Sequence, residues 1–230
     1  MGSDSLFCAS RVFALSGLIV PLAAFGQSFS LDSLEGLQPH KVMMEVASHR
    51  GYMGVHVTDP GEFQGTNEDK LVILDGLQFH DGVIEVSLAG ALGSHAGEAA
   101  RGFVGIAFRV ADDASSFEAF YLRPTNGRAN DQLRRNHSAQ YISYPEYPWH
   151  RLRNETPSQY ESYVDLVPGE WTQVRIEVSG AQGRLYVHGA EQPVLIVSDL
   201  KLGEEREGGV GLWIGPGTDA YFRDLRVETN

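Results

Sequence analysis

Apolar and polar positions alternate along most of the chain, and this period of two predicts β-strands. Ile84, Val86 and Leu88, for example, alternate with Glu85 and Ser87. Runs of this kind, or short apolar runs, lie at 83–89, 103–110, 117–123, 173–178, 185–187, 194–197, 210–215 and 221–227. No stretch has the periodicity of an amphipathic helix, so no helix is expected.

Turn-forming pairs separate these runs. Asp-Gly occurs at 75–76 and 81–82, Ser-Gly at 179–180 and Gly-Gly at 208–209, and such pairs accommodate the positive φ angles of tight turns. About a dozen short strands at this spacing predict an all-β, two-sheet antiparallel sandwich. The length of the chain favours a jelly roll with one concave sheet.

The alternation also assigns side chains to the two faces of each strand. If the apolar residues of two central strands point into the core, Arg109, Tyr121 and Arg123 share the opposite face. Glu85 then belongs to the same outer row, which resembles a polar concave binding face. The alternative is a solvated face with cross-strand ion pairs, which is the commoner case in antiparallel sheets.

Length, composition and charge narrow the function classes. The chain has 230 residues, of which 42% are hydrophobic and 21% are charged, and its net charge is −12. These values suit one globular domain with a sizeable core. The acidic balance argues against a nucleic-acid partner and against a polybasic membrane-surface protein.

Residues 1–26 have the pattern of a secretory signal peptide. Arg11 precedes an apolar stretch at 12–25 that is short for a membrane span, and Ala24 and Gly26 place small residues before Gln27. We therefore expect cleavage near Gln27, a secreted or periplasmic protein, one domain over 27–230 and no stable membrane insertion after removal of the leader. An uncleaved N-terminal anchor is the alternative.

Cysteine and histidine usage bears on metals and cofactors. Cys8 is the only cysteine and lies in the leader, so the expected mature chain has no disulfide and no thiolate site. His137 and His150 lack a metal-ligand spacing, and Asp112-Asp113 is usually a turn, although such a pair can join a loop calcium site. No cofactor is expected.

The segment 121–153 is a cationic, aromatic island in this acidic chain. It contains six arginines and two acidic residues, a local balance of +4, together with four tyrosines and a tryptophan. Guanidinium groups donate paired hydrogen bonds and aromatic faces stack on flat or ring-shaped ligands. The segment therefore predicts a site for a carbohydrate or another small polar or anionic ligand, carried on a long loop region.

Several segments resemble a known superfamily. The runs 74–88, 101–110 and 117–124, the hairpin GEWTQVRIEVSGAQGRLYVHG at 169–189 and the closing strands at 208–227 resemble the concanavalin A-like lectin/glucanase superfamily. The nearest pattern is that of the group containing laminin-G-like domains and 3-keto-disaccharide hydrolase domains. The resemblance implies a concave face that binds carbohydrate and, in the keto-disaccharide group, cleavage of an oxidised glycoside. The Glu-x-Asp-x-Glu strand of laminarinase-type glucanases is absent.

Candidate catalytic residues are those that can move a proton beside the arginines. His137 titrates near neutral pH, and Glu85 and Glu161 are candidate acids, since hydrolysis by paired carboxylates needs them about 5–10 Å apart. Glu118 and Glu146 are further carboxylates in the region. For any one of these residues, a structural role is at least as common as a catalytic one.

Candidate binding residues come from the outer face and the island. The segment 123–128 is predicted to form a turn, with Asn126-Gly127 at positive φ. Tyr144, Tyr147 and Trp149 could form a sugar-stacking wall. The substrate-binding candidates are Arg109, Tyr121, Arg123, Asn126, Arg128, Arg134, Arg135, Asn136, Gln140, Tyr144, Tyr147, Trp149, His150 and Arg151.

These observations favour an exported carbohydrate-active protein that binds a glycan or glycoside on the concave sheet face. Through its resemblance, it would be a glycoside hydrolase of the 3-keto-disaccharide type. Two alternatives stay open, a non-catalytic carbohydrate-binding module and a lyase that acts on an acidic polysaccharide, in which cations would neutralise a uronate. An enzyme requires an acid or a base that faces the arginines, whereas a module requires only rings and donors.

Overall fold

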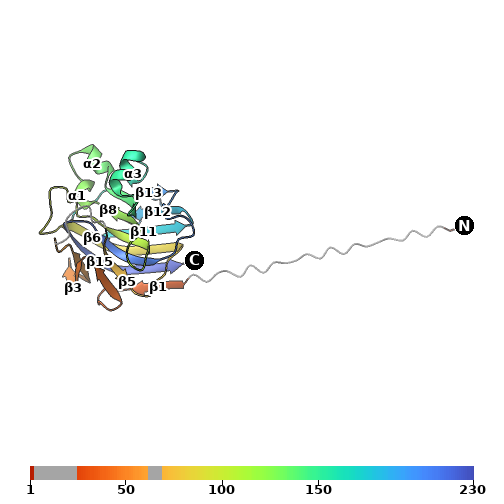
Figure 1. Cartoon of the computed structure of the whole chain (residues 1–230), viewed down its shortest axis with the longest axis horizontal. Coiled ribbons are helices and arrows are strands. Elements are labelled where there is room, and N and C mark those ends of the chain that lie inside the picture. Colours follow the sequence, from red (N-terminus) through yellow and green to blue (C-terminus); the bar gives the residue numbers. More distant parts are fainter. Residues whose placement is uncertain (3–24, 62–68) are drawn as a thin grey trace.

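Two antiparallel sheets, packed face to face, make up the molecule (Figure 1). The computed structural model describes residues 1–2, 25–61 and 69–230. The expected leader falls almost entirely outside these residues, and its expected cleavage site lies within the first strand. The strands are β1 Phe25–Phe29, β2 Leu37–His40, β3 Met43–His49, β4 Tyr52–Thr58, β5 Lys70–Leu74, β6 Gly82–Leu92, β7 Val104–Val110, β8 Phe117–Leu122, β9 Ala139–Tyr144, β10 Glu161–Ser162, β11 Thr172–Ser179, β12 Gln182–Val187, β13 Leu195–Val197, β14 Gly209–Ile214 and β15 Thr218–Thr229.

One sheet has eight strands in the order β13-β12-β11-β6-β15-β4-β3, with β1 paired to β15. The other has seven in the order β10-β9-β8-β7-β14-β5-β2. Consecutive strands β6 and β7 lie in different sheets, as do β14 and β15, so the chain crosses repeatedly between the layers. The predicted all-β jelly-roll sandwich is confirmed.

The core fills the space between the two sheets. Inward-facing residues of β6, β7 and β8, such as Ile84, Phe108 and Phe120, are fully buried. The rings of Phe108 and Phe120 stack at 6.0 Å. A side chain at Gly183 of β12 would collide with the Phe120 ring from the opposite sheet, so glycine there permits close approach of the two layers.

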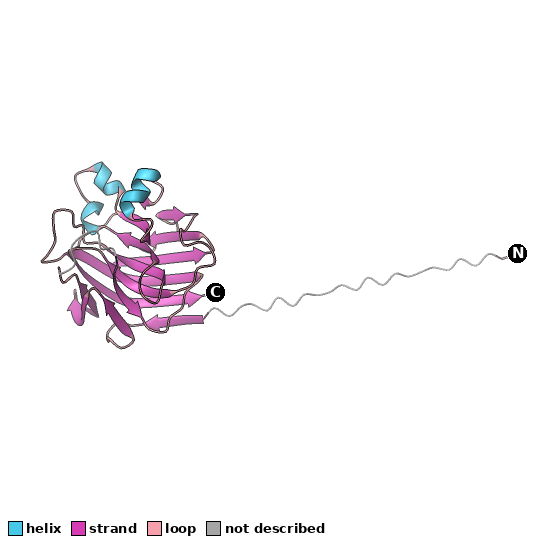
Figure 2. Ribbon diagram, in the orientation of Figure 1, coloured by secondary structure: helices cyan, strands magenta, loops and turns pink. Residues whose placement is uncertain are grey.

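The alternation located eight strands correctly, from β6 to β8 and from β11 to β15, but the island was interpreted wrongly as a long loop. It contains β9 and three short helices. The three helices lie together on one side of the sandwich (Figure 2). They are α1 Pro124–Gly127, α2 Gln132–Asn136 and α3 Trp149–Glu155. The predicted turn at 123–128 is instead the single helical turn α1, and neither Asn126 nor Gly127 has a positive φ. Helices this short carry no amphipathic period that a sequence could reveal.

In the part of the chain that the structure describes, no helix is long and apolar enough to cross a membrane.

Candidate functional site

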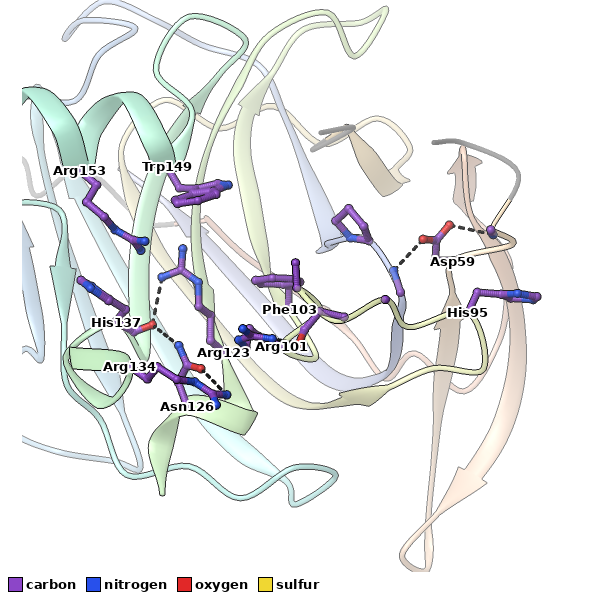
Figure 3. Close-up of a pocket in the computed structure, with 16 residues that line it drawn as sticks. Asp59, His95, Arg101, Phe103, Arg123, Asn126, Arg134, His137, Trp149 and Arg153 are labelled. Carbon is purple, nitrogen blue, oxygen red and sulfur yellow. Dashed lines mark hydrogen bonds between the residues drawn. The ribbon is translucent and has the colours of Figure 1, made fainter. Parts of the chain in front are cut away.

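A cavity of about 720 Å³ lies where strands of both sheets end (Figure 3). Its walls come from the segment after β4, the β6–β7 connection, the start of α1, helices α2 and α3, and the β14–β15 turn. The cavity therefore lies at one end of the sandwich and not on a sheet face, where the sequence predicted the site. The lining residues are Asp59, Gly61, His95, Gly97, Ala99, Ala100, Arg101, Phe103, Arg123, Asn126, Arg134, His137, Trp149, Arg153, Pro216 and Gly217.

The two ends of the cavity differ in charge. Figure 3 shows Arg123, Arg134 and Arg153 gathered with Trp149 at one end, whereas Asp59 and His95 lie at the other. Arg101 and Phe103 lie between them. Four arginines from separate segments of the chain thus converge on one cavity, because the β6–β7 connection and the island meet at the same strand ends.

Arg123 is fixed in the floor of the cationic end. It follows β8 directly, and its side chain is 5% exposed. One terminal nitrogen donates to the His137 carbonyl at 3.0 Å and to Glu161 at 3.3 Å. The other donates to the Tyr121 hydroxyl at 2.8 Å and to Gln140 at 2.9 Å. Tyr121 and Gln140, both predicted to bind ligand, are buried beneath Arg123 and position it.

Glu161 is the counter-ion of the cationic end. Its side chain is 2% exposed and forms ion pairs with Arg123 and with Arg153 of α3. Its Oε2 also lies 2.9 Å from Nδ1 of His137. One carboxylate therefore joins three cationic or titratable groups from three segments, which is the geometry of an organising residue rather than of a free acid.

His137 borders two cavities. It contributes to the large one and to a neighbouring cavity of about 210 Å³, which Asn136 and Glu161 also line. Burial lowers the pKa of the His137 imidazole, with Glu161 opposing this effect and Arg153 and Arg123 adding to it. The ring is therefore neutral at neutral pH, as a general base must be.

Arg101 and Arg134 form no ion pair with a carboxylate among the described residues, although the charge of Glu98 acts on Arg101. Arg101 donates to the carbonyls of Glu98 and Ala100 at 2.7 and 2.6 Å. Arg134 reaches Asn126 Oδ1 only at 3.4 Å, and its buried Nε has no hydrogen-bond partner among these residues. Burial lowers the pKa of Arg101, the charges of Arg134 and Arg123 lower it further, and the charge of Glu98 opposes this shift. The guanidinium groups of Arg134 and Arg123 thus repel that of Arg101 across the cavity.

Two rings line the cavity. Trp149 stands over the guanidinium of Arg153, whose central carbon lies 4.6 Å from the ring centroid. Phe103 contacts Tyr121 edge to face at 6.1 Å. Of the three rings in the predicted sugar-stacking wall, only Trp149 lines the cavity. Tyr144 instead stacks on Phe117 in the sandwich.

The remaining island candidates lie outside the large cavity. Arg128 forms an exposed bidentate pair with Asp165 at 2.8 Å. Arg151 pairs with Glu155 at 2.8 Å and lies over the Tyr147 ring. Arg135 donates to the Tyr163 hydroxyl, Asn136 accepts from Gln132, and His150 is exposed. Exposed interactions of this kind contribute little to stability.

The predicted row of Glu85 with Arg109, Tyr121 and Arg123 on one face is wrong. Glu85 lies in the eight-stranded sheet, opposite Arg175 and Arg226, and is exposed. Arg109 and Tyr121 belong to the seven-stranded sheet, and Arg123 directly follows its strand β8. Alternation reports the face of a strand but not the sheet to which the strand belongs.

The prediction that Arg109 binds ligand is also contradicted, because its side chain is completely buried. All five of its N–H groups are bonded, to two carboxylates and three carbonyls, namely Glu118, Asp81, His80, Gly203 and Gly180. Its φ of 53° and the register shift opposite Gly209 and Val210 form a β-bulge that turns the side chain away from the outer face.

Sequence reasoning missed Arg101, Phe103 and the site role of Arg153. A signal for the first two was available. Strands β7 and β8 form an antiparallel pair in which Val104 lies opposite Leu122. The residues just before β7 must therefore lie beside Arg123, just after β8. Groups of three or more potential metal-ligating side chains do not occur within 25–61 and 69–230.

Comparison with known proteins supports the fold. No protein-family model matches the chain, and no curated protein matches it. Similar solved structures include the carbohydrate-binding module CBM66 from Bacillus subtilis, with a TM-score of 0.57 and 13% identity over 84% of this chain and 95% of that one. A Bacillus subtilis protein of unknown function with a galectin-like fold has a TM-score of 0.57 and 11% identity, over 90% and 96%. A Crh5 transglycosylase in complex with NAG has a TM-score of 0.53 and 14% identity, over 89% and 84%. The fold is the concanavalin A-like jelly roll that the sequence resembles.

Proposed function

We propose that this protein binds carbohydrate in the cavity at the end of the sandwich. The observation that carries the proposal is the combination, in one cavity, of two aromatic rings and several fixed donors. Trp149 and Phe103 supply faces or edges for a sugar ring, and Asn126 and the arginines supply hydrogen bonds. Sites with these components orient polar ring-shaped ligands. A carbohydrate-binding module and a transglycosylase bound to NAG share the fold.

A glycan-binding screen followed by two aromatic variants tests the proposal. Trp149→Ala removes a ring from the cavity, so affinity falls about tenfold, a loss of about 1.4 kcal/mol. Tyr52→Ala is the matched control. Tyr52 lies in β4 of the eight-stranded sheet, is 51% exposed and does not line the cavity. Equal affinities for the two variants and the parent contradict the proposal.

Cleavage of a 3-keto glycoside stays a prediction from the sequence resemblance. Among the three predicted catalytic residues, His137 borders the cavity, whereas Glu161 is engaged by the arginines. Incubation with 3-keto glycosides and with acidic polysaccharides separates the alternatives. Hydrolysis yields a reducing sugar, a lyase yields an unsaturated product that absorbs ultraviolet light, and a binding module leaves both substrates intact. If turnover occurs, His137→Gln lowers kcat more than it changes KM.

We further propose that the protein is exported and loses its leader near Gln27. The support is the pattern of Arg11, the apolar stretch and the small residues Ala24 and Gly26. Intact-mass measurement of secreted or periplasmic protein tests this proposal. A mass that still includes Met1 contradicts it.

A further inference from the structure

The charges around the cavity do not balance. Arg101, Arg123, Arg134 and Arg153 line it, whereas the carboxylates that act on these arginines or lie at the opposite end are Glu161, Glu98 and Asp59. Glu161 is committed to Arg123, Arg153 and His137. The counter-ion of the cationic end is therefore already engaged.

Asp59 is not a counter-ion of Arg101 or Arg134 either. It accepts hydrogen bonds from the backbone N–H groups of Gly61 at 3.0 Å and Gly217 at 2.7 Å. It also lies 3.8 Å from Nζ of the buried Lys70. Figure 3 places it at the end of the cavity away from Arg134. Arg134 thus forms no ion pair with a carboxylate in the described part of the chain, and Glu98 attracts Arg101 without forming an ion pair with it.

The unpaired guanidinium groups are held in place. Arg101 is bonded to two carbonyls of its own connection, and its backbone carbonyl accepts from the Thr125 N–H at 3.3 Å, which ties that connection to α1. Asn126 links Arg134 to the His137 carbonyl, to which its amide donates at 3.2 Å. Donors that are fixed before a ligand arrives lose little entropy when it binds.

From this geometry we infer that the ligand is an acidic glycan whose charged group binds between Arg101 and Arg134. The inference rests on the proposed carbohydrate binding and names the class of sugar. A carboxylate or a sulfate ester accepts paired hydrogen bonds from guanidinium groups and neutralises their repulsion. Phe103 then lies beside the acidic sugar, and the rest of the glycan extends toward Asp59 and Gly217.

Four oligosaccharides of equal length test the inference. They are a uronic acid oligosaccharide, its methyl ester, a sulfated oligosaccharide and its desulfated form. We expect a charged form to bind at least tenfold more tightly than its neutral counterpart, with affinity that falls as salt increases. Preference for the uronate identifies the carboxylate as the ligand group, and preference for the sulfated sugar identifies the sulfate.

Substitutions of Arg101 and Arg134 test whether these two residues bind the charged group of the sugar. Arg101→Gln and Arg134→Gln each lower affinity for the charged sugar at least tenfold more than they lower affinity for its neutral counterpart. Arg101→Lys and Arg134→Lys keep the positive charge but lose the paired donors of the guanidinium group. Their affinities for the charged sugar therefore lie between those of the parent and the Gln variants. Arg128→Gln is the matched control, since Arg128 is paired with Asp165 outside the cavity. Thermal unfolding of each variant confirms that it is folded.

The outcomes separate this inference from the proposed function. If neutral and charged sugars bind equally and depend on Trp149 alone, carbohydrate binding stands and the acidic ligand is wrong. Unchanged affinity in both Gln variants likewise overturns the inference. If no glycan binds to the parent, the inference and the proposed function both fail.

Discussion

Arg109 and Arg134 show two uses of the same side chain. Arg109 is completely buried, and all five N–H groups have acceptors, including the carboxylates of Glu118 and Asp81. Arg134 lies in the wall of a cavity, has no carboxylate partner among the described residues and leaves its Nε without an acceptor there. The first arrangement is complete without a ligand, whereas the second is not.

The difference separates a guanidinium whose donors are all bonded within the fold from one whose donors are not. Desolvating a guanidinium is costly unless every donor is satisfied, so a fully bonded arginine stabilises the fold only as part of its network. A cluster of arginines that repel one another is retained at a cost to stability, which is typical of functional sites. Alternation drew attention to Arg109 and local charge density drew attention to Arg134, and neither signal separates the two cases.

The largest expected effect on stability concerns the buried hydrogen-bond network of Arg109. Arg109→Gln leaves the buried carboxylate of Glu118 without its cation, although the Tyr141 hydroxyl at 2.7 Å and the Leu202 N–H at 3.1 Å still donate to it. We expect the free energy of unfolding to fall by about 3 kcal/mol or more, measured by urea denaturation. Arg128→Gln, which breaks an exposed pair, serves as the control and changes stability little. Equal stability of the two variants contradicts the structural role of Arg109.

Glu161 gives the next largest effect. Glu161→Gln removes the counter-ion of Arg123 and Arg153 while keeping the size of the side chain. Because the Glu161 and Arg123 side chains are nearly inaccessible, we expect a loss of about 2–3 kcal/mol in the free energy of unfolding. Glu155→Gln, at an exposed pair with Arg151, is the control. An unchanged unfolding midpoint for Glu161→Gln shows that Glu161 is not the organising counter-ion.

Substitution of the cavity arginines Arg101 and Arg134 is expected not to lower the free energy of unfolding. Arg101→Gln or Arg134→Gln removes a charge that its neighbours repel, so the free energy of unfolding stays within about 0.5 kcal/mol of the parent or rises. Chemical denaturation without ligand measures this value. A loss as large as that of Arg109→Gln indicates that the cavity arginines are structural, and the contrast between the two regions disappears.

Period-two alternation predicted the sandwich because it depends on local residue pattern. It located β6, β7 and β8, and it placed Tyr121 correctly on the face away from Phe120. It failed at Arg109, where a single bulge reverses the direction of one side chain. Such a bulge depends on the strand opposite, and one sequence does not report it.

The candidate site was located only in part, for a related reason. Arg123, Asn126, Arg134, His137 and Trp149 were found through local enrichment in charge and rings. Arg101 lies apart from that enrichment, and its place in the site depends on the pairing of β7 with β8. Glu85 shows the converse error, because the sheet to which a strand belongs is set by the global topology.

The smallest expected effect is a pH dependence due to His137. Burial holds the pKa of the folded His137 below its ordinary value of 6.5, with Glu161 opposing and Arg153 and Arg123 reinforcing this shift. Between 6.5 and the lower folded pKa, the unfolded chain binds a proton that the folded chain does not, so stability falls as the pH falls through this window. We expect His137→Gln to lose less stability than the parent between about pH 7 and pH 5, measured by urea denaturation at each pH. His150→Gln, which changes an exposed histidine outside the cavity, keeps the slope of the parent. Identical slopes for all three proteins show that the partial burial of His137 at the cationic end does not shift its titration.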